Sequence, residues 1–443
     1  DISGTLRFKG MNDAGTPAEL EFATIYAKHT NITASGDAEA GELHFRARAA
    51  SDSLDSRLVI DGNSRMSLSN NLDLNTGNTV FGKSAWNIAS TSTNNASDYN
   101  TVIGEKAMGT GTIAGAASNV AIGYQAATAM AEGDNNVVIG YQALDIATNV
   151  DGCVAIGATA MGGNIGSEEA DGCIAIGNAA LSGDLDATAL NTVAIGASAL
   201  AALVGGAGNT AIGFEAGKGL TSGGSNTVLG YEALLTADVA AANTAIGNGA
   251  MKLVPITDGI EYCVAVGASA LTSASGATNG ISGTVAIGVS ALTALTTGTG
   301  NTAIGFEALS TCAAGLHNTA VGYQALKTME ASGQGYNTGI GYLAGTALTS
   351  GVGNTAIGHQ ALDLATTAVN NVSLGKNSMS SVPAGVALTG CVAIGESALI
   401  APSITTGANN TIAIGAQALA ALTSGAGNLA IGYQALAAIT DAN

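Results

Sequence analysis

Charged residues, proline and tryptophan are all scarce in this sequence. Only 10% of the 443 residues are charged, whereas typical globular domains carry about 25%. The chain has four prolines and one tryptophan but 63 glycines, and apolar residues still reach 47%. Such a chain buries its surface in thin, repetitive layers more readily than in one bulky core.

Basic residues are few and unevenly placed. The 32 acids and 13 bases give a formal net charge of −19, and no arginine follows Arg65. Because phosphate neutralisation needs clustered lysine and arginine, the sequence predicts no nucleic-acid partner. The negative charge is better suited to keeping a long particle soluble.

Long apolar runs, leaders and paired cysteines are missing as well. No uninterrupted run of about 18 apolar residues occurs, so we expect no membrane insertion. The sequence starts at Asp1 with no charged-then-apolar leader, so it predicts no secretion signal. Five cysteines without a CxxC pair fit neither a disulfide scaffold nor a zinc or haem motif. We therefore predict no metal site and no cofactor.

One internal repeat fills most of the chain, as in NTAIGFEAL (301–309) and NLAIGYQAL (428–436). A large apolar residue precedes its central glycine, and Asn, Cys or Thr stands four residues before the glycine. Alanine follows three residues after the glycine in nineteen copies, with Ser378 as the exception. The copies are spaced mostly by 17 residues and otherwise by 19 to 22. The twenty glycines are Gly82, Gly104, Gly123, Gly140, Gly157, Gly177, Gly196, Gly213, Gly230, Gly247, Gly267, Gly288, Gly305, Gly322, Gly341, Gly358, Gly375, Gly395, Gly415 and Gly432.

This repeat predicts an all-β fold over residues 76–443, an elongated β-solenoid or β-roll of about twenty coils of 17–22 residues. A 17-residue unit cannot bury its own apolar face, whereas stacked neighbours can. The alternation in Thr302-Ala303-Ile304 favours a strand that ends at the glycine. We expect Ile304 and Leu309 to fill the interior, and Ala303 to join an outer stripe of small residues. Identical stripes on identical chains favour closed cyclic symmetry.

Residues 1–75 lack the repeat and predict a small N-terminal β module. GELHFRARA (41–49) alternates apolar with basic side chains, which is the pattern of a half-buried strand. LRFKG (6–10), ELEFATIYA (19–27) and RLVIDG (57–62) predict further short strands. Terminal caps of this kind are expected of solenoids.

The NTAIGYQAL-type repeat resembles the shaft repeats of bacteriophage tail fibres, especially those of marine phages. It is also similar to the shorter head repeats of trimeric autotransporter adhesins. GELHFRARA followed by RLVIDGNSRMSLSNN (57–71) resembles the segment that precedes such repeats in phage fibres. The resemblance covers nearly the whole chain. Neither a C-terminal chaperone-like domain nor a coiled-coil stalk with a membrane anchor is recognisable, so we expect a shaft.

The resemblance implies a parallel homotrimer without a cofactor that takes part in host attachment. Its implied partners are further copies of itself, other virion tail proteins, and a glycan or protein of the host surface. Its implied location is the virion tail fibre, or otherwise the extracellular space or a cell surface. A cellular surface adhesin and an extracellular filament subunit stay open as alternatives.

Eight copies carry an aromatic residue directly after the glycine. An exposed ladder of this kind would stack on sugar rings of a host glycan. Rings that stack on one another would instead stabilise adjacent coils or a seam between subunits. The eight residues are Tyr124, Tyr141, Phe214, Tyr231, Phe306, Tyr323, Tyr342 and Tyr433.

Two enzymatic hypotheses fit parts of the pattern, and neither is favoured. IGxxA matches the hexapeptide signature of left-handed β-helix acyltransferases, but only one clear hexad occurs in each coil. Those enzymes need a catalytic histidine, and His359 stands at the aromatic ladder position. Glu215, Glu232 and Glu307 raise the hypothesis of a glycosidase, but Gln replaces Glu in other copies, which indicates a solvated face. We predict no catalytic residue and a protein that is not an enzyme.

Cysteine and threonine mark two further repeat positions. Free cysteine behaves as a small buried hydrophobe, so we expect the cysteines at the Asn position to be buried free thiols. They are Cys153, Cys173, Cys263 and Cys391. Threonine ladders are a feature of ice-binding solenoids, but each threonine shares its face with an isoleucine that we expect to be buried. The ladder considered is Thr210, Thr227 and Thr244.

Overall fold

In the computed structural model of the protein, the residues described are 2–11, 19–29, 41–48, 54–60, 66–68, 77–86, 97–109, 115–165, 170–253, 259–272, 280–330 and 333–441. These residues form an all-β structure whose one helix is the three-residue 3-10 turn η1 (Thr406–Ala408). The predicted all-β solenoid is therefore confirmed. Within the same residues, no helix has the length and apolar character needed to cross a bilayer.

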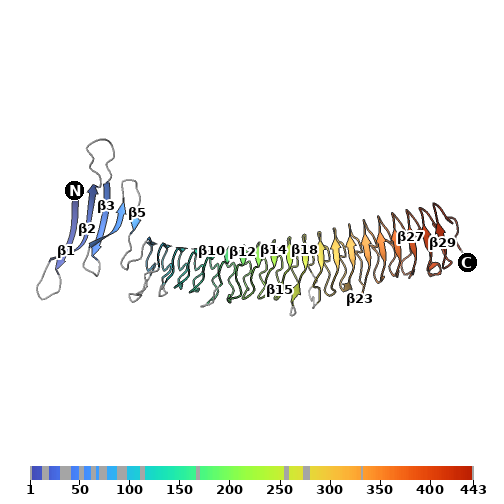
Figure 1. Ribbon diagram of the computed structural model, residues 1–443, viewed down its shortest axis with the longest axis horizontal. Helices are drawn as coiled ribbons and strands as arrows, with labels where there is room; N and C mark the ends of the chain where they lie inside the picture. The colour runs from blue at the N-terminus through green and yellow to red at the C-terminus, as the bar shows by residue number, and fades with distance from the viewer. Residues whose placement is uncertain are drawn as a thin grey trace, which may run out of the picture. The chain divides into compact units, whose positions relative to one another are not determined.

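The N-terminal strands form a separate antiparallel sheet in the order of the chain, as Figure 1 shows. The predicted short strands are all present, and the basic strand GELHFRAR is the third of the five. The Arg46 guanidinium lies 5.9 Å from the centre of the Tyr26 ring. The strands are β1 (Ile2–Met11), β2 (Glu19–His29), β3 (Gly41–Arg48), β4 (Leu54–Ile60) and β5 (Met66–Leu68).

Every copy of the repeat contributes a three-residue strand directly before its glycine. These strands are β6 (Thr79–Phe81), β7 (Thr101–Ile103), β8 (Val120–Ile122), β9 (Val137–Ile139), β10 (Val154–Ile156), β11 (Ile174–Ile176), β12 (Val193–Ile195), β13 (Thr210–Ile212), β14 (Thr227–Leu229), β16 (Thr244–Ile246), β18 (Val264–Val266), β19 (Val285–Ile287), β20 (Thr302–Ile304), β22 (Thr319–Val321), β24 (Thr338–Ile340), β25 (Thr355–Ile357), β26 (Val372–Leu374), β27 (Val392–Ile394), β28 (Ile412–Ile414) and β29 (Leu429–Ile431). Two short parallel pairs lie in the spacers: β15 (Ala240–Ala241) with β17 (Ile260–Glu261), and β21 (Gly315–Leu316) with β23 (Gly333–Gln334).

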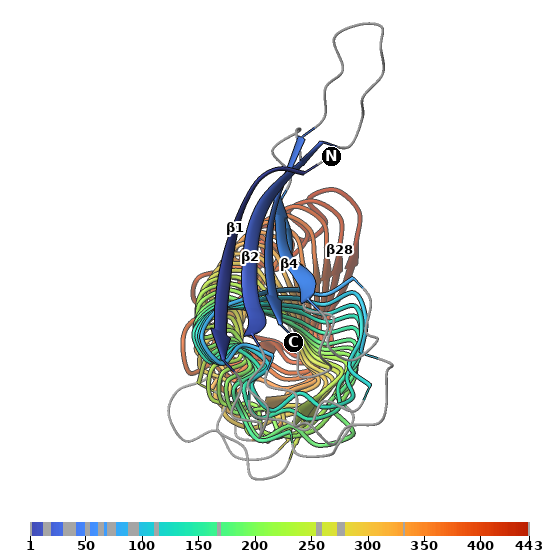
Figure 2. The same ribbon diagram turned by 90° about the vertical axis from the view of Figure 1, so that its left-hand side faces the viewer.

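The repeat strands pair in parallel and in register with the next copy. Ala303 of β20, for example, lies opposite Ala286 of β19 and Ala320 of β22. The chain divides into two compact units, Asp1–Glu169 and Ala170–Asn443. The ladder runs from β6 to β10 in the first unit and from β11 to β29 in the second. In Figure 2 the coils of the second unit, from green to red, lie one behind another.

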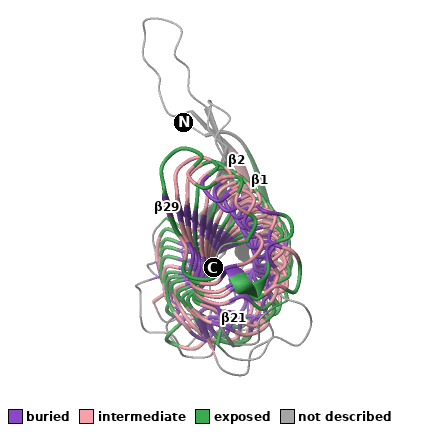
Figure 3. Cartoon of the chain, turned by 90° about the vertical axis from the view of Figure 1, so that its right-hand side faces the viewer, coloured by how far each residue is buried: buried purple, intermediate pink, exposed green. Residues whose placement is uncertain are grey.

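Leu309 is buried as predicted, but the two faces of the strand are the reverse of the prediction. Ala303, Ala308 and Leu309 are fully buried, whereas Ile304 is 36% exposed. The strand therefore turns its small middle residue inward and its two larger residues outward. Leu309, from the following corner, fills the interior beside the alanines. The predicted outer stripe of alanines does not exist, and Figure 3 shows the buried residues as rows that pass from coil to coil.

The central glycine is required by the distance between coils. Gly305 has a φ of +133°, and a Cβ on it would meet the Gly322 carbonyl oxygen at 2.4 Å. Neighbouring coils come equally close at Gly82, where a Cβ would lie 2.3 Å from the Gly104 carbonyl oxygen. No side chain fits at this corner, which explains why the repeat has glycine there in all twenty copies.

A buried asparagine ladder ties the coils together along one edge of the sheet. The backbone N–H of Asn354 donates to Oδ1 of Asn337 at 2.9 Å, and the N–H of Asn371 donates to Oδ1 of Asn354 at 3.1 Å. Nδ2 of Asn354 donates to the Ala368 carbonyl at 2.6 Å. Asparagine serves this position well because its side-chain oxygen accepts from the backbone N–H of the next coil while its Nδ2 donates to a spacer carbonyl.

Cysteine interrupts this ladder in a regular way. The backbone N–H of Cys391 still donates to Oδ1 of Asn371 at 2.9 Å, and the Cys391 thiol donates to the Ala408 carbonyl at 3.4 Å. In the second unit each ladder cysteine is followed one coil later by threonine, at Thr192, Thr284 and Thr411. The hydroxyl of each of these threonines is buried without a hydrogen-bond partner. The cysteines are free and buried, and Cys312, outside the ladder, is buried too.

Candidate functional site

The surface of the repeat region has two regular features, and both belong to the strand and its following corner. The first is the outer sheet face, defined as the side chains three residues and one residue before each glycine. The second is the corner row, defined as the residues one, two and five positions after each glycine. Because the coils stack in register, each of these side chains lies next to the side chain at the same repeat position in the coils before and after it.

The predicted aromatic residues lie on the corner row and stack on one another wherever consecutive copies carry them. The rings of Tyr124 and Tyr141 are 5.4 Å apart, and those of Phe214 and Tyr231 are 5.3 Å apart. The longest series runs from Phe306 through Tyr323 to Tyr342, with 5.3 Å at each step. Offset-stacked rings at this separation stabilise the pair by about 0.5–1.5 kcal/mol beyond their burial.

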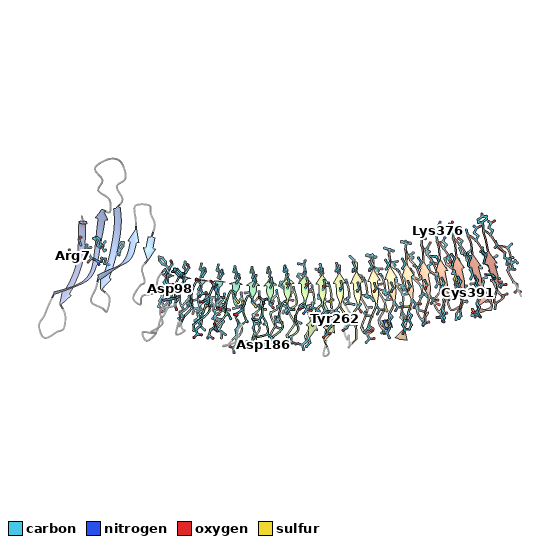
Figure 4. The ribbon with its side chains drawn as sticks, in the orientation of Figure 1. Arg7, Asp98, Asp186, Tyr262, Lys376 and Cys391 are labelled. Carbon is cyan, nitrogen blue, oxygen red and sulfur yellow. The ribbon has the colours of Figure 1, made fainter. Side chains whose placement is uncertain are left out.

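His359 continues this series, and sequence reasoning had given it no role beyond substitution in the ladder. Its ring lies 5.0 Å from that of Tyr342 at an interplanar angle of 16°. A second, shorter aromatic row occurs before the strand, where His317 stacks on Tyr336 at 5.5 Å. This second row lies at the position just before the ladder asparagine. Tyr262 shares that position, and Figure 4 places it at the opposite edge of the coils from Lys376 of the corner row.

The stacking limits how these aromatics can contact a ligand. Rings 5.3 Å apart leave no space for a sugar ring between them, so Tyr323 has both faces covered. A glycan would have to use ring edges or the outer face of an end ring. Phe214 is such an end ring, since the preceding copy has Ala197 at this position instead of a ring, and its side chain is 43% exposed.

Charged pairs flank two of the aromatic stacks. The carboxylate of Glu215 lies 2.7 Å from Nζ of Lys218, and that of Glu307 lies 2.6 Å from Nζ of Lys327. Lys252 pairs in the same way with Glu232. All three glutamates are therefore ion-paired, which sequence reasoning missed. The signal was present, because lysine stands five residues after a glycine in each of these places.

The ion pairs set the protonation of the corner row. The hydrogen bond from Lys327 lowers the pKa of Glu307, and the bond from Gln324 adds to this effect. The bond from Lys252 lowers the pKa of Glu232. The Tyr231 hydroxyl bonds the Glu232 carboxylate, which raises the pKa of Tyr231. These carboxylates remain ionised at neutral pH, so they can accept hydrogen bonds but not donate a proton.

Gln and Glu in the corner row also bond to each other between coils. Nε2 of Gln324 donates to Glu307 at 2.7 Å, and Nε2 of Gln142 donates to Gln125 at 3.0 Å. The exchange of Glu for Gln thus preserves an amide–oxygen ladder beside the aromatic stacks. Such a strip of oxygens and amides next to aromatic rings is chemically suited to contact with a polyhydroxylated ligand.

Asp363 is the corner-row residue with the most perturbed acidity. Burial raises its pKa to about 6, and the His359 ring and the Gln360 side chain oppose that rise. Its Oδ1 is buried without a hydrogen-bond partner. Burial also raises the pKa of Asp145, which stands at the same repeat position. These aspartates occur where Gln, not Glu, precedes them by three residues.

The premise against ice binding is that each threonine shares its face with a buried isoleucine, and the outer sheet face shows that this premise is wrong. Thr210, Thr227 and Thr244 do form an in-register ladder. The neighbouring apolar residues are not buried, however, since Ile212 is 36% and Leu229 is 45% exposed. Threonine and isoleucine therefore share an outward face.

Comparisons with known protein families, curated proteins and solved structures found no match for the chain. Among the residues that the structure describes, no group of three or more His, Cys, Asp or Glu side chains is placed to hold a metal ion.

Proposed function

We propose that this chain is the shaft of a homotrimeric attachment fibre, most consistent with a bacteriophage tail fibre that mediates host attachment. The observation that carries the proposal is the in-register stacking of near-identical coils. Neighbouring coils pair through their backbones, and asparagine and aromatic contacts join them where consecutive copies carry these residues. This arrangement extends a structure along one direction and leaves its flanks free for partners.

The proposal gives the chain no catalytic step. Glu215, Glu232 and Glu307 hold lysines, and His359 stacks on a tyrosine, so these groups already have structural partners. Structural use of these side chains agrees with a fibre that acts through its surface. Other tail proteins at its ends and a glycan or protein of the host surface are the proposed partners.

Immunogold electron microscopy tests the fibre role. Antibodies raised against the purified chain are applied to phage particles and to cells from the same sample, with pre-immune serum as the control. We expect gold along fibres that project from virion tails. Gold confined to cell-surface structures or free filaments would contradict the tail-fibre proposal and support a cellular adhesin or filament subunit instead.

A glycan array tests the host-contact part of the proposal. We expect the purified protein to bind a subset of glycans and the Phe214→Ala variant to bind them at least several-fold more weakly, because no ring stacks on Phe214 from the preceding coil. Leu364→Ala, at an exposed residue of a spacer, is the matched control. Equal binding by both variants would remove Phe214 from the contact.

A further inference from the structure

The outer sheet face has a composition unlike the rest of the surface. Its forty positions in twenty copies hold 31 apolar residues and nine threonines, without one charge, in a chain of net charge −19. The corner row beside it carries lysine and glutamate freely, as at Lys218 and Glu215. If these side chains were exposed to water in the functional protein, some of the twenty copies would carry a charged residue there. The absence of charged residues therefore indicates that another surface covers this face.

The same positions are open in the single chain. Ile304 is 36%, Leu374 is 41% and Leu229 is 45% exposed. The middle residue of each strand, such as Ala303, is fully buried and cannot take part. The apolar groups that lack a partner are therefore the two outward residues of each strand, repeated from β11 to β29 in the second unit.

The area of this face is sufficient for a stable contact. At a coil spacing of about 4.8 Å, the strands from β11 to β29 extend about 70 Å, and a face two side chains wide spans about 10 Å. The product, about 700 Å², is close to the roughly 800 Å² that each partner contributes to a standard interface. A continuous apolar patch of this size is larger than most monomeric proteins expose.

We propose that the outer sheet face is the surface through which copies of this chain associate, parallel and in register. The occupant is another copy because the face repeats at the coil spacing over its whole length, and an identical chain repeats at the same spacing. The inference rests on the proposed function only for the number of chains, three. The outer sheet face takes the place of the predicted alanine stripe as the contact between copies, because the alanines lie in the interior.

The order of threonine and valine along the face selects parallel, in-register packing. In that arrangement every threonine meets the same threonine of the other copies, so the hydroxyls can bond one another. In an antiparallel pair with full overlap of β11–β29, Thr210 would face Val392 and Thr227 would face Val372. Likewise Thr319 would face Val285 and Thr338 would face Val264. Burying hydroxyls against apolar side chains without a hydrogen bond is unfavourable.

Light scattering on face variants tests the surface. The triple variant Ile287→Lys, Ile304→Lys and Ile340→Lys places three charges on the face, and the control Val204→Lys, Val239→Lys and Leu364→Lys places them at exposed apolar spacer residues. We expect the face variant to fall to a single chain of 42.9 kDa. The control should keep the wild-type mass. Equal masses for both variants would overturn the proposal.

Cysteine cross-linking gives a second test that does not disturb the fold. The Ile212→Cys variant should form a covalent dimer under mild oxidation only if copies lie parallel and in register. A mixture of Ile212→Cys and Ile394→Cys chains would form mixed dimers in the antiparallel arrangement instead. The native thiols do not interfere, because all five are buried. Absence of the Ile212→Cys dimer would overturn the alignment.

The outcomes separate this inference from the fibre role. A wild-type protein that is a single chain contradicts both the homotrimer and the face. A wild-type trimer that survives the face charges contradicts only the face. Gold labelling of virion tails stands or falls independently of both.

Discussion

At the scale of single residues, the coil depends on positions that admit few kinds of side chain. Gly305 combines a φ of +133° with a Cβ position 2.4 Å from the Gly322 oxygen. Asn337 has both its amide and its carbonyl oxygen bonded in the buried ladder. Leu309 is buried although its φ is +50°, a conformation that branched and bulky residues avoid. Burial of the leucine side chain offsets that strain.

The glycine corner leads to a direct test. We expect Gly305→Ala to lower stability by about 3 kcal/mol or more, because backbone strain and a clash with the next coil add. Thermal unfolding followed by circular dichroism measures the change. Gly115→Ala is the control, since nothing lies within 4 Å of a Cβ there. An equal loss in both variants would mean that the corner is not the cause.

Asp363 predicts a pH effect on stability. Its folded pKa of about 6 lies above the ordinary value of 3.8 for aspartate, so the folded state binds this proton more tightly than the unfolded state does. That stability is present below about pH 4 and is lost as pH rises through about 6. We expect Asp363→Asn to stabilise the protein by about 1 kcal/mol at pH 8, after allowance for solvent screening, and not at pH 4.

Denaturant midpoints at the two pH values check this expectation. Leu364→Ala, at the exposed neighbour of Asp363, changes no titratable group, so this control should have the same effect at pH 4 and pH 8. A stabilisation by Asp363→Asn that is the same at both pH values would show that ionisation of Asp363 is not responsible.

At the scale of the coil, each element depends on its two neighbours and on nothing farther away. β20 pairs with β19 and β22, Asn318 bonds Asn301 at 3.0 Å, and the Phe306 ring meets that of Tyr323. Contacts of this kind make stability a sum of nearest-neighbour terms. A whole coil should therefore be removable, whereas part of one should not.

Deletion of residues 301–317 tests this property. The deletion removes one 17-residue period and joins Gly300 to Asn318, so β22 can pair with β19 in the same register. We expect the midpoint of thermal unfolding to change by only a few degrees. Deletion of residues 301–309 shifts the register and should unfold several coils. Similar losses in the two deletions would refute nearest-neighbour stacking.

At the scale of the molecule, five cysteines in the two units report on packing over a long part of the chain. Burial raises the pKa of the Cys263 thiol to about 11 and also raises those of Cys312 and Cys391. We expect no reaction with a thiol reagent at pH 8 in the folded protein, and five reactive thiols after denaturation without reductant.

A Leu364→Cys variant supplies the control, because residue 364 is 55% exposed and its thiol should react in the folded state. Fewer than five thiols in the denatured wild-type protein would reveal a disulfide. Rapid reaction of native thiols would show that the coils around them open readily.

The sequence by itself determined the period, the strand before each glycine and the reason for the glycine. These features are local, since β alternation and a φ near +130° depend on residues within one coil and its neighbour. It also showed that Ala303 and Ile304 lie on opposite sides of the strand. Which side is inside was decided only by the tertiary structure. Leu309 and Asn301 are buried in the same interior, so the strand has room there for alanine but not for isoleucine. Alternation is symmetric and carries no information about that space, and for the same reason the sequence alone could not locate the uncharged outer sheet face.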